Sequence, residues 1–229
     1  MSLCDTCCVR QHCAKHKKGY VEESLFCIKN FKMNALYDLS LLSDKQRQHT
    51  DLRIDADGTD KEAFSLLKQF EEQITDFVSQ GRNLYLYSTT CGNGKTSWAL
   101  RLAQAYLNKI WYSTTVDCKV LFISVPKFFI KLKDNISASN EYIAHIKQHV
   151  TECDLVIWDD LGTKVGTEFE VENLLNIINN RIDNGKSNIY TSNIIPEDLR
   201  HCIGERLYSR TVNLSSVVEL KGQDKRGLV

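Results

Sequence analysis

A short glycine-containing stretch after an apolar run constrains this chain more than any other part of its sequence. The apolar residues 84–87 lead into Thr89-Thr90-Cys91-Gly92-Asn93-Gly94-Lys95-Thr96, and helical periodicity follows. In such a turn the backbone N–H groups point at one anion, a lysine neutralises the terminal phosphates and a hydroxyl holds Mg²⁺. Thr89 stands where the usual pattern begins with glycine. The stretch predicts an ATP-binding loop made by Thr90, Cys91, Gly92, Asn93, Gly94, Lys95, Thr96 and Ser97.

A second apolar run ends in two carboxylates. Residues 155–158 are Leu, Val, Ile and Trp, and Asp159 and Asp160 follow at the predicted strand end. An ATP site of this kind needs a strand-end acid for the metal, so we expect Asp159 and Thr96 to hold Mg²⁺. Asp160 is then expected to polarise the water that attacks the terminal phosphate. A solvated turn would explain the two carboxylates alone, but the presence of both motifs favours the ATP site.

Helical and strand-like patterns alternate through most of the chain. One expected helix begins at Pro126, and three others cover residues 60–79, 141–149 and 168–184. The expected strands cover residues 119–125, 155–159 and 187–191. This alternation is typical of a parallel sheet with helices on both faces. Ligands of such sheets bind at the carboxyl ends of the strands, where the two motifs lie. The expected fold class is therefore α/β, a P-loop parallel sheet sandwiched by helices.

Composition limits the class of protein. The chain has 229 residues, 42% of them hydrophobic and 25% charged, with 29 basic and 29 acidic side chains. These values are ordinary for one globular domain with an appendage, and the charge balance argues against nucleic-acid binding by bulk charge. No apolar run approaches the length of a transmembrane helix, and the first residues lack the features of a secretory leader. We therefore expect a cytoplasmic protein without a membrane partner.

Cysteine usage indicates a metal site near the start of the chain. Of nine cysteines, five fall within the first 27 residues, and in a cytoplasmic chain this clustering favours metal over disulfides. We prefer to interpret the cluster as a Zn²⁺ site with four thiolate ligands. Cys8, His12 and His16 are further candidate ligands. An iron–sulfur cluster and free surface thiols are the alternatives. The four preferred zinc ligands are Cys4, Cys7, Cys13 and Cys27.

Two later stretches complete the predicted ATP site. Asn193 follows a predicted strand about one β-α-β unit after Asp159, so we expect it to orient the attacking water. Pro196 and the acidic residues after it mark a helix start. Arg206 and Arg210 are four apart on that helix and share one face, from which they could reach a neighbouring subunit's ATP. Such an arginine contributes about 10³–10⁵ in rate and makes hydrolysis conditional on assembly.

Together these motifs resemble the AAA+ ATPases, and more closely the DnaC/DnaI-type replicative helicase loaders in their short phage-encoded form. The resemblance covers residues 84–226 and includes Gly222-Gln223-Asp224-Lys225-Arg226. It implies that Arg210 acts in trans as the arginine finger and that Arg226 binds nucleotide as the second sensor. The α-helical lid of most AAA+ proteins is expected to be essentially absent, because the sequence stops three residues after Arg226.

The resemblance also implies partners and a domain plan. Residues 1–50 would form a Cys-rich region that docks a DnaB-type replicative helicase, residues 51–60 a linker, and residues 61–229 the AAA+ domain. ATP would drive self-association into a hexamer or spiral, and the helicase would be delivered onto single-stranded DNA. Residues 127–133 mix lysines with aromatic side chains, as single-strand binding would require, but Phe128, Phe129 and Leu132 fit a buried core equally well. Hydrolysis is expected to be slow without DNA or a partner.

Two other functions agree with the same motifs. One is an IstB-like AAA+ partner of a transposition machine, which shares every ATP-site motif. The other is a nucleotide-independent adaptor or inhibitor that keeps the fold to bind a helicase. The cysteine cluster favours helicase docking over the first alternative. The presence of Lys95, Asp159, Asp160 and Arg210 argues against the second.

Overall fold

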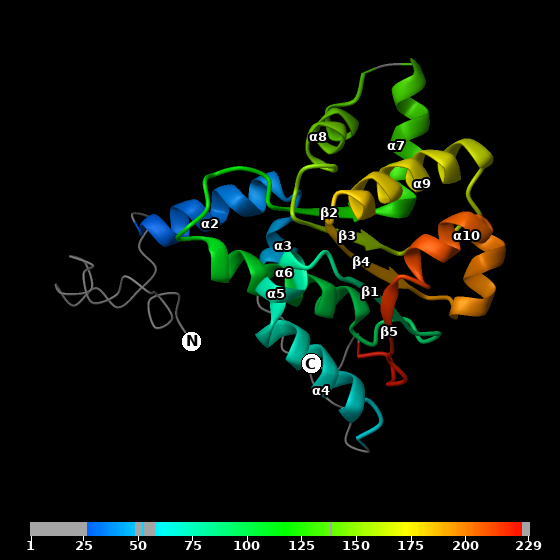
Figure 1. Cartoon of the computed structure of the whole chain (residues 1–229), viewed down its shortest axis with the longest axis horizontal. Helices are drawn as coiled ribbons and strands as arrows, with labels where there is room; N and C mark the ends of the chain where they lie inside the picture. The colour runs from blue at the N-terminus through cyan, green and yellow to red at the C-terminus, as the bar shows by residue number, and fades with distance from the viewer. Residues whose placement is uncertain (1–26, 49–51, 53–57, 138, 226–229) are drawn as a thin grey trace.

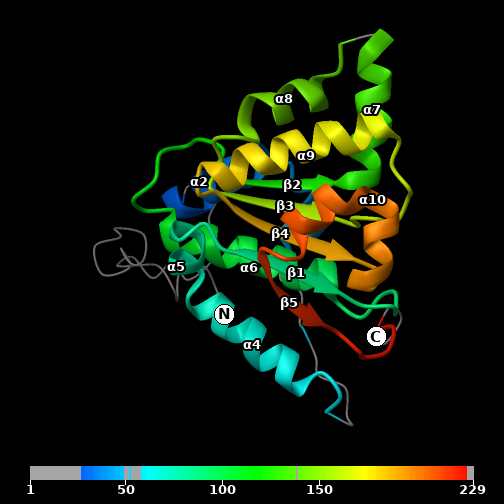
Figure 2. The ribbon, with the colours of Figure 1, turned by 45° about the vertical axis from the view of Figure 1, so that its right-hand side comes forward.

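The computed structural model describes residues 27–48, 52, 58–137 and 139–225. Its centre is a five-stranded parallel sheet with the strand order β2-β3-β4-β1-β5. The strands are β1 (Asn83–Tyr87), β2 (Val120–Ser124), β3 (Leu155–Asp159), β4 (Ser187–Ser192) and β5 (Ser215–Glu219). Helices cover both faces of this sheet (Figure 1, Figure 2). The α/β sandwich expected from the alternating pattern is confirmed.

One face of the sheet is covered by helices from the first half of the chain. They are α2 (Ile28–Leu39), α3 (Asp44–Arg47), α4 (Lys61–Glu72), α5 (Ile74–Ser79) and α6 (Lys95–Ile110). A T-shaped contact between the rings of Phe64 and Trp98, 5.1 Å between centroids, joins α4 to α6. The strand side chains in this core are Leu84, Leu86, Val120, Phe122, Leu155, Ile157, Ile189 and Val218.

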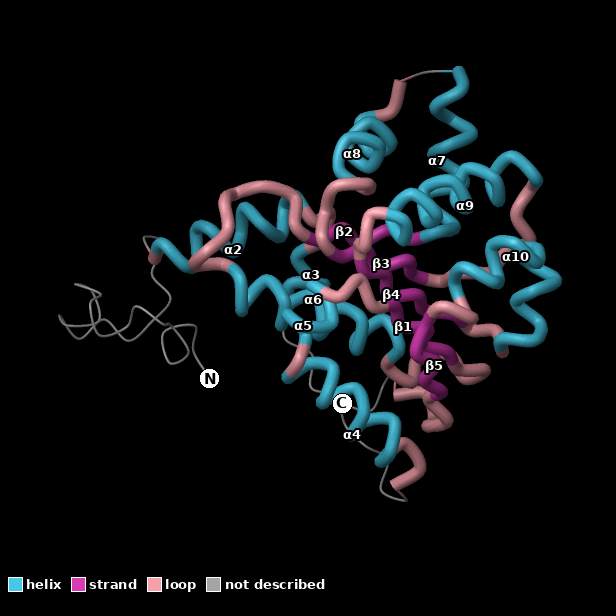
Figure 3. Tube along the Cα trace, in the orientation of Figure 1, coloured by secondary structure: helices cyan, strands magenta, loops and turns pink. Residues whose placement is uncertain are grey.

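The opposite face is covered by helices from the second half, as the separation of the two helix layers in Figure 3 shows. They are α7 (Val125–Ser137), α8 (Glu141–His149), α9 (Glu168–Asp183) and α10 (Pro196–Thr211). The strand side chains on this side alternate with those of the first core, because successive residues of a strand point to opposite faces. They are Tyr85, Leu121, Ile123, Val156, Trp158 and Tyr190. Burial on both faces explains why β1, β2 and β3 are nearly continuous apolar runs.

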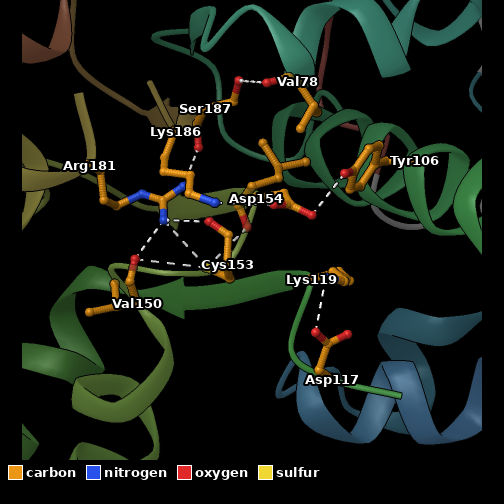
Figure 4. Close-up of polar contacts among 11 residues, drawn as sticks. Val78, Tyr106, Asp117, Lys119, Val150, Cys153, Asp154, Arg181, Lys186 and Ser187 are labelled. Atoms are coloured by element: carbon orange, nitrogen blue, oxygen red, sulfur yellow. Dashed lines mark hydrogen bonds and ion pairs between the residues drawn. The ribbon is translucent and has the colours of Figure 1, made fainter. Parts of the chain in front are cut away.

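A buried arginine joins several elements at the amino ends of the strands (Figure 4). Arg181, in the last turn of α9, has no exposed surface. Its guanidinium donates to the carbonyls of Val150 (2.5 Å), Cys153 (3.0 Å) and Ser187 (2.5 Å) and to Oδ1 of Asn188 (2.7 Å). Burial lowers the pKa of this guanidinium, but an arginine stays charged at neutral pH. One side chain thus connects the end of α8, the segment before β3, α9 and the start of β4, at the edge away from the phosphate-binding loop.

Among the differences from the sequence-based expectation, two concern the helix over residues 60–79 and the strand β5. The helix expected over residues 60–79 is divided at Gln73 (φ −102°, ψ 22°), although no helix-breaking residue marks this position. The edge strand β5 was not expected, because Ser215 and Ser216 open it and only Val218 is buried. It forms through its parallel pairing with β1.

Helix α2 lies inside the region that the sequence analysis assigned to helicase docking. Its residues Met33 and Leu36 are buried in the core of the first face. The backbone after it is also tied to the sheet, since the N–H of Phe122 donates to the carbonyl of Ser40 (3.0 Å). In the described parts of the chain, no helix combines the length and apolarity needed to cross a membrane.

Candidate nucleotide-binding site

The predicted phosphate-binding loop connects β1 to α6. Gly92 and Gly94 have φ values of 75° and 106°, a left-handed conformation that glycine adopts without steric cost. The side chain of Lys95 is buried, and its ammonium donates to the carbonyl of Thr90 (2.9 Å) and to Oδ1 of Asn93 (3.2 Å). The loop leads into the N-terminus of α6, and the N–H groups and dipole of a helix N-terminus favour an anion. Its shape and charge fit the phosphates of a nucleotide.

A chain of hydrogen bonds joins this loop to the ends of β3 and β4. The hydroxyl of Thr96 donates to Oδ1 of Asp159 (2.8 Å), and the hydroxyl of Thr191 donates to the same oxygen (2.7 Å). The backbone N–H of Asp160 donates to the hydroxyl oxygen of Thr191 (3.0 Å). The amide of Asn193 donates to Oδ1 of Asp160 (3.3 Å). Five residues from three segments of the chain therefore form one connected network.

The electrostatics of this network fit a divalent cation. Burial raises the pKa of the Asp159 carboxyl, the nearby charge of Asp160 raises it further, and hydrogen bonds from Thr191 and Thr96 oppose these effects. A cation beside Asp159 would stabilise its charged form. Mg²⁺ prefers hard oxygen ligands, which the carboxylate and the Thr96 hydroxyl supply. The residues present thus fit a nucleotide bound with Mg²⁺.

The carboxylate after β3 has an unusual backbone conformation. Asp160 has φ 60°, which is uncommon for a residue other than glycine. Such conformations occur preferentially where a site requires a particular direction of the chain. Here the turn brings the Asp160 carboxylate to Asn193, the residue expected to orient water.

Other predicted site residues lie apart from this network. Cys91 is exposed at the outside of the loop, and Ser97 is half-buried in the first turn of α6. Arg206 and Arg210 are exposed on α10, after a break at Gly204 (φ 78°) that the sequence analysis did not expect. Their placement on the surface is compatible with a role toward a second subunit.

Several predicted ligands fall on residues that the structure does not describe. Arg226 and three of the four preferred zinc ligands, Cys4, Cys7 and Cys13, are among these. Cys27 is described and is half-buried at the start of α2. Within the described ranges, no group of three or more His, Cys, Asp or Glu side chains is arranged to hold a metal ion.

The aromatic side chains of residues 127–133 are not available for base stacking in this conformation. Phe128 and Phe129 are buried in the core of the second face. The lysines have protein partners: Lys131 pairs with Asp134 (3.3 Å), and Lys133 with the buried Glu170 (3.2 Å). The stacking interpretation of this stretch is wrong and the core interpretation is confirmed, because the amphipathic period of α7 packs these rings against the sheet.

Thr191 is a site residue that the sequence analysis missed. Residues 187–191 were read as strand, and the register that pairs Trp158 with Tyr190 places Thr191 beside Asp159. The available signal was a threonine near the end of a predicted strand, two residues before Asn193. Its significance depends on the register between two strands, and single-sequence patterns do not determine that register.

A model of the bacterial DnaA ATPase domain matches residues 62–215. The chain belongs to this family. The matched range of this DnaA-type ATPase domain begins in α4 and includes the phosphate-binding loop, both strand-end carboxylates and α10. A nucleotide-binding ATPase fold is thereby established for the chain.

Solved structures share the fold of this DnaA-type domain. The DnaC helicase loader is 19% identical, with 78% of this chain and 100% of that chain covered and a TM-score of 0.64. DnaI is 19% identical, with coverages of 80% and 92% and a TM-score of 0.56. The replication initiator DnaA bound to AMPPCP and single-stranded DNA is 21% identical, with coverages of 81% and 52% and a TM-score of 0.59. No match was found among curated protein sequences.

These comparisons confirm the resemblance to the AAA+ ATPases that include DnaA and the DnaC/DnaI-type loaders. The phage-encoded form stays a prediction. Because the structural matches are at low sequence identity, they establish the fold, and the function of this DnaA-type domain is a separate question.

Replacing Thr191 by valine keeps the side-chain shape and removes the hydroxyl that holds Asp159. We expect Thr191→Val to lower ATP hydrolysis by about 10- to 100-fold, the usual cost of losing a partner that orients a metal ligand. The Mg²⁺ concentration for half-maximal hydrolysis should rise, and Thr191→Ser should restore both values. Steady-state hydrolysis over a Mg²⁺ titration checks this. A valine variant with the parent's Mg²⁺ dependence would show that Thr191 does not position the metal ligand.

Proposed function

We propose that this chain is an ATP-dependent loader that binds a DnaB-type replicative helicase and delivers it onto single-stranded DNA in replication. The observation that carries the proposal is that the structural match to the DnaC helicase loader extends over 100% of that chain. The coverage of DnaI, 92% of its length, supports it further. The DnaA structure bound to single-stranded DNA supports the choice of DNA partner.

In this proposal the network at the strand ends hydrolyses ATP. The loop N–H groups and Lys95 bind the phosphates, and Thr96 and Asp159 hold Mg²⁺. The metal, when bound, neutralises charge on the phosphates during transfer. Asp160 polarises the attacking water, and Asn193, fixed by its bond to Asp160, orients that water. The position of each group agrees with its role, since the network already joins loop and strand ends.

Hydrolysis in this proposal depends on self-association. Arg210 is exposed on α10. In this proposal it acts on the ATP of an adjacent subunit, and it reaches that ATP only when the subunits assemble side by side. A hexamer or spiral has this arrangement. ATP binding then builds the assembly, and hydrolysis, slow in the isolated chain, is completed in it.

The helicase-docking part of the proposal concerns the start of the chain. We assign docking to residues 1–50, with a Zn²⁺ site at Cys4, Cys7, Cys13 and Cys27, a linker to residues 51–60, and the ATPase domain to residues 61–229. Because α2 packs against the sheet, a deletion that tests this domain plan must leave α2 in place. Deleting residues 1–50 would remove α2 and expose core, whereas deleting residues 1–26 leaves α2 in place.

Light scattering after size exclusion tests the proposed function. A DnaB-type hexameric helicase is mixed with the full chain, with a version lacking residues 1–26, or with Lys95→Ala, each with and without ATP. We expect a complex with the full chain that depends on residues 1–26 and that ATP strengthens in the parent only. The thermal unfolding temperature of the shortened chain should match the parent, which shows that the domain stays folded.

The other outcomes separate the alternatives. Absence of a complex in every condition would overturn the loader assignment and favour the transposition-type partner. A complex that forms equally well with Lys95→Ala and without ATP would indicate the nucleotide-independent adaptor.

A further inference from the structure

A buried carboxylate at the start of α4 does not cap its own helix. Asp60 precedes the helix and is 2% exposed, yet its side chain accepts no hydrogen bond from the first turn. Its two oxygens instead accept the consecutive backbone N–H groups of Lys221 (2.7 Å) and Gly222 (2.9 Å), directly after β5. Hydrogen bonds to a charged acceptor are strong, and a buried carboxylate requires them. Asp60 therefore anchors a segment from the other end of the described chain.

The anchored segment runs along the phosphate-binding loop. Residues 220–225 are referred to as the C-terminal segment. The carbonyl of its first residue, Leu220, accepts a hydrogen bond from the buried amide of Asn93 (2.9 Å). Oδ1 of that same amide accepts from the ammonium of Lys95 (3.2 Å). The C-terminal segment thus orients the side chain that contacts the lysine of the loop.

The far end of the C-terminal segment contacts the loop at Gly92. The N–H of Lys225 donates to the carbonyl of Gly92 (3.1 Å). The carboxylate of Asp224 lies against the same glycine, so that a Cβ there would be 1.8 Å from its Oδ1. The ammonium of Lys225 lies 5.3 Å from the ring centroid of Phe64, one turn of α4 beyond Asp60. The C-terminal segment is therefore held by Asp60 and Phe64 at α4. It contacts the loop at Asn93 and Gly92.

We infer that Asp60 is a positioning residue for nucleotide binding, because it holds the C-terminal segment against the phosphate-binding loop. The inference rests on the proposed use of this loop to bind ATP. Gly92 and Gly94 give the loop many accessible conformations, and glycine loses the most entropy when it is ordered. A loop that is already held in shape binds its ligand without this cost. Loss of the anchor lowers nucleotide affinity although Asp60 itself is not part of the phosphate-binding motif.

Nucleotide titration of full-length variants tests the inference. A fluorescent ATP analogue with Mg²⁺ is titrated into the parent, Asp60→Ala, Asp60→Asn and Glu62→Ala. We expect the Kd to rise about 10-fold in Asp60→Ala, the size typical of losing a group that orients a ligand residue. The asparagine of Asp60→Asn keeps one acceptor oxygen, so the Kd of this variant should lie between those of the parent and Asp60→Ala. Glu62 is an exposed carboxylate in the same helical turn, and its removal should leave the Kd unchanged.

A double-mutant cycle separates positioning from general stability. Deleting residues 221–229 removes the partners of Asp60, so adding Asp60→Ala to the shortened chain should not raise the Kd again. An alanine variant that binds like the parent would overturn the inference, as would an equal loss in the full-length and shortened chains. If the parent itself bound no nucleotide, the proposed function would be overturned together with the inference. If the parent bound nucleotide and Asp60→Ala bound it equally well, only the inference would be overturned.

Discussion

Lys95→Ala is expected to lower the affinity for ATP by at least about 100-fold, which corresponds to about 2.7 kcal/mol, and to abolish hydrolysis. The ammonium is buried in the loop, where a positive charge interacts with phosphate far more strongly than it would in water. The change also removes the hydrogen bonds to Thr90 and Asn93, so the loop loses two internal contacts. Titration with a fluorescent ATP analogue and a phosphate-release assay measure the two effects.

Lys109→Ala is the matched control for this change. Lys109 is an exposed lysine in the last turn of the same helix, α6, and its ammonium donates to the carbonyl of Glu72. Its removal should leave the ATP affinity within twofold of the parent, roughly 0.4 kcal/mol. If Lys95→Ala bound and hydrolysed ATP like the parent, the assignment of the loop to ATP would be wrong.

Arg181→Met should be the most damaging substitution for stability outside the nucleotide site. Methionine fills much of the space but leaves the carbonyls of Val150, Cys153 and Ser187 without their buried donor. Each buried polar group left unsatisfied costs about 1–3 kcal/mol, so three such carbonyls cost on the order of 3 kcal/mol or more. The unfolding temperature should fall by about 10 °C, given about 2–4 °C per kcal/mol for a domain of this size.

Thermal and urea unfolding monitored by circular dichroism check this prediction. Lys186→Met is the control, because Lys186 makes a partly exposed ion pair with Asp154 (3.3 Å) near the same cluster. Such pairs contribute about 1 kcal/mol or less, so the control should unfold close to the parent. Arg181→Lys keeps the charge without the planar fork and should be intermediate. An Arg181→Met chain as stable as the parent would contradict the structural role of the network.

The parts of the nucleotide site that the sequence predicted are those whose chemistry is local. Gly92, Gly94 and Lys95 lie within one turn, and the phosphate-binding function requires these residue types in this order. Asp159 and Asn193 were predicted because polar residues directly follow strand-like runs, and parallel strands end at one edge of the sheet. The structure brings Asp159 to the loop and Asn193 to Asp160, as the motif argument requires.

The parts that the sequence did not predict depend on contacts between distant segments. Asp60 was taken as the end of a linker and the start of a helix, since nothing in its neighbours indicates partners that follow β5. Phe128 and Phe129 fitted a DNA-binding stretch as well as a core, and only the packing of α7 on the sheet distinguishes the two. Arg181 was not recognised, because its acceptors belong to other elements.

The sequence by itself therefore determined the fold class and the ATPase family, and it predicted the principal residues of the candidate nucleotide site. Hydrophobic periodicity reports which face of an element is buried, and a motif reports chemistry that must occur within a few residues. The tertiary structure alone decided the strand order, the pairing of β5 with β1 and the anchoring of the C-terminal segment by Asp60. These features depend on register and on contacts between residues far apart in the chain, which local patterns do not encode.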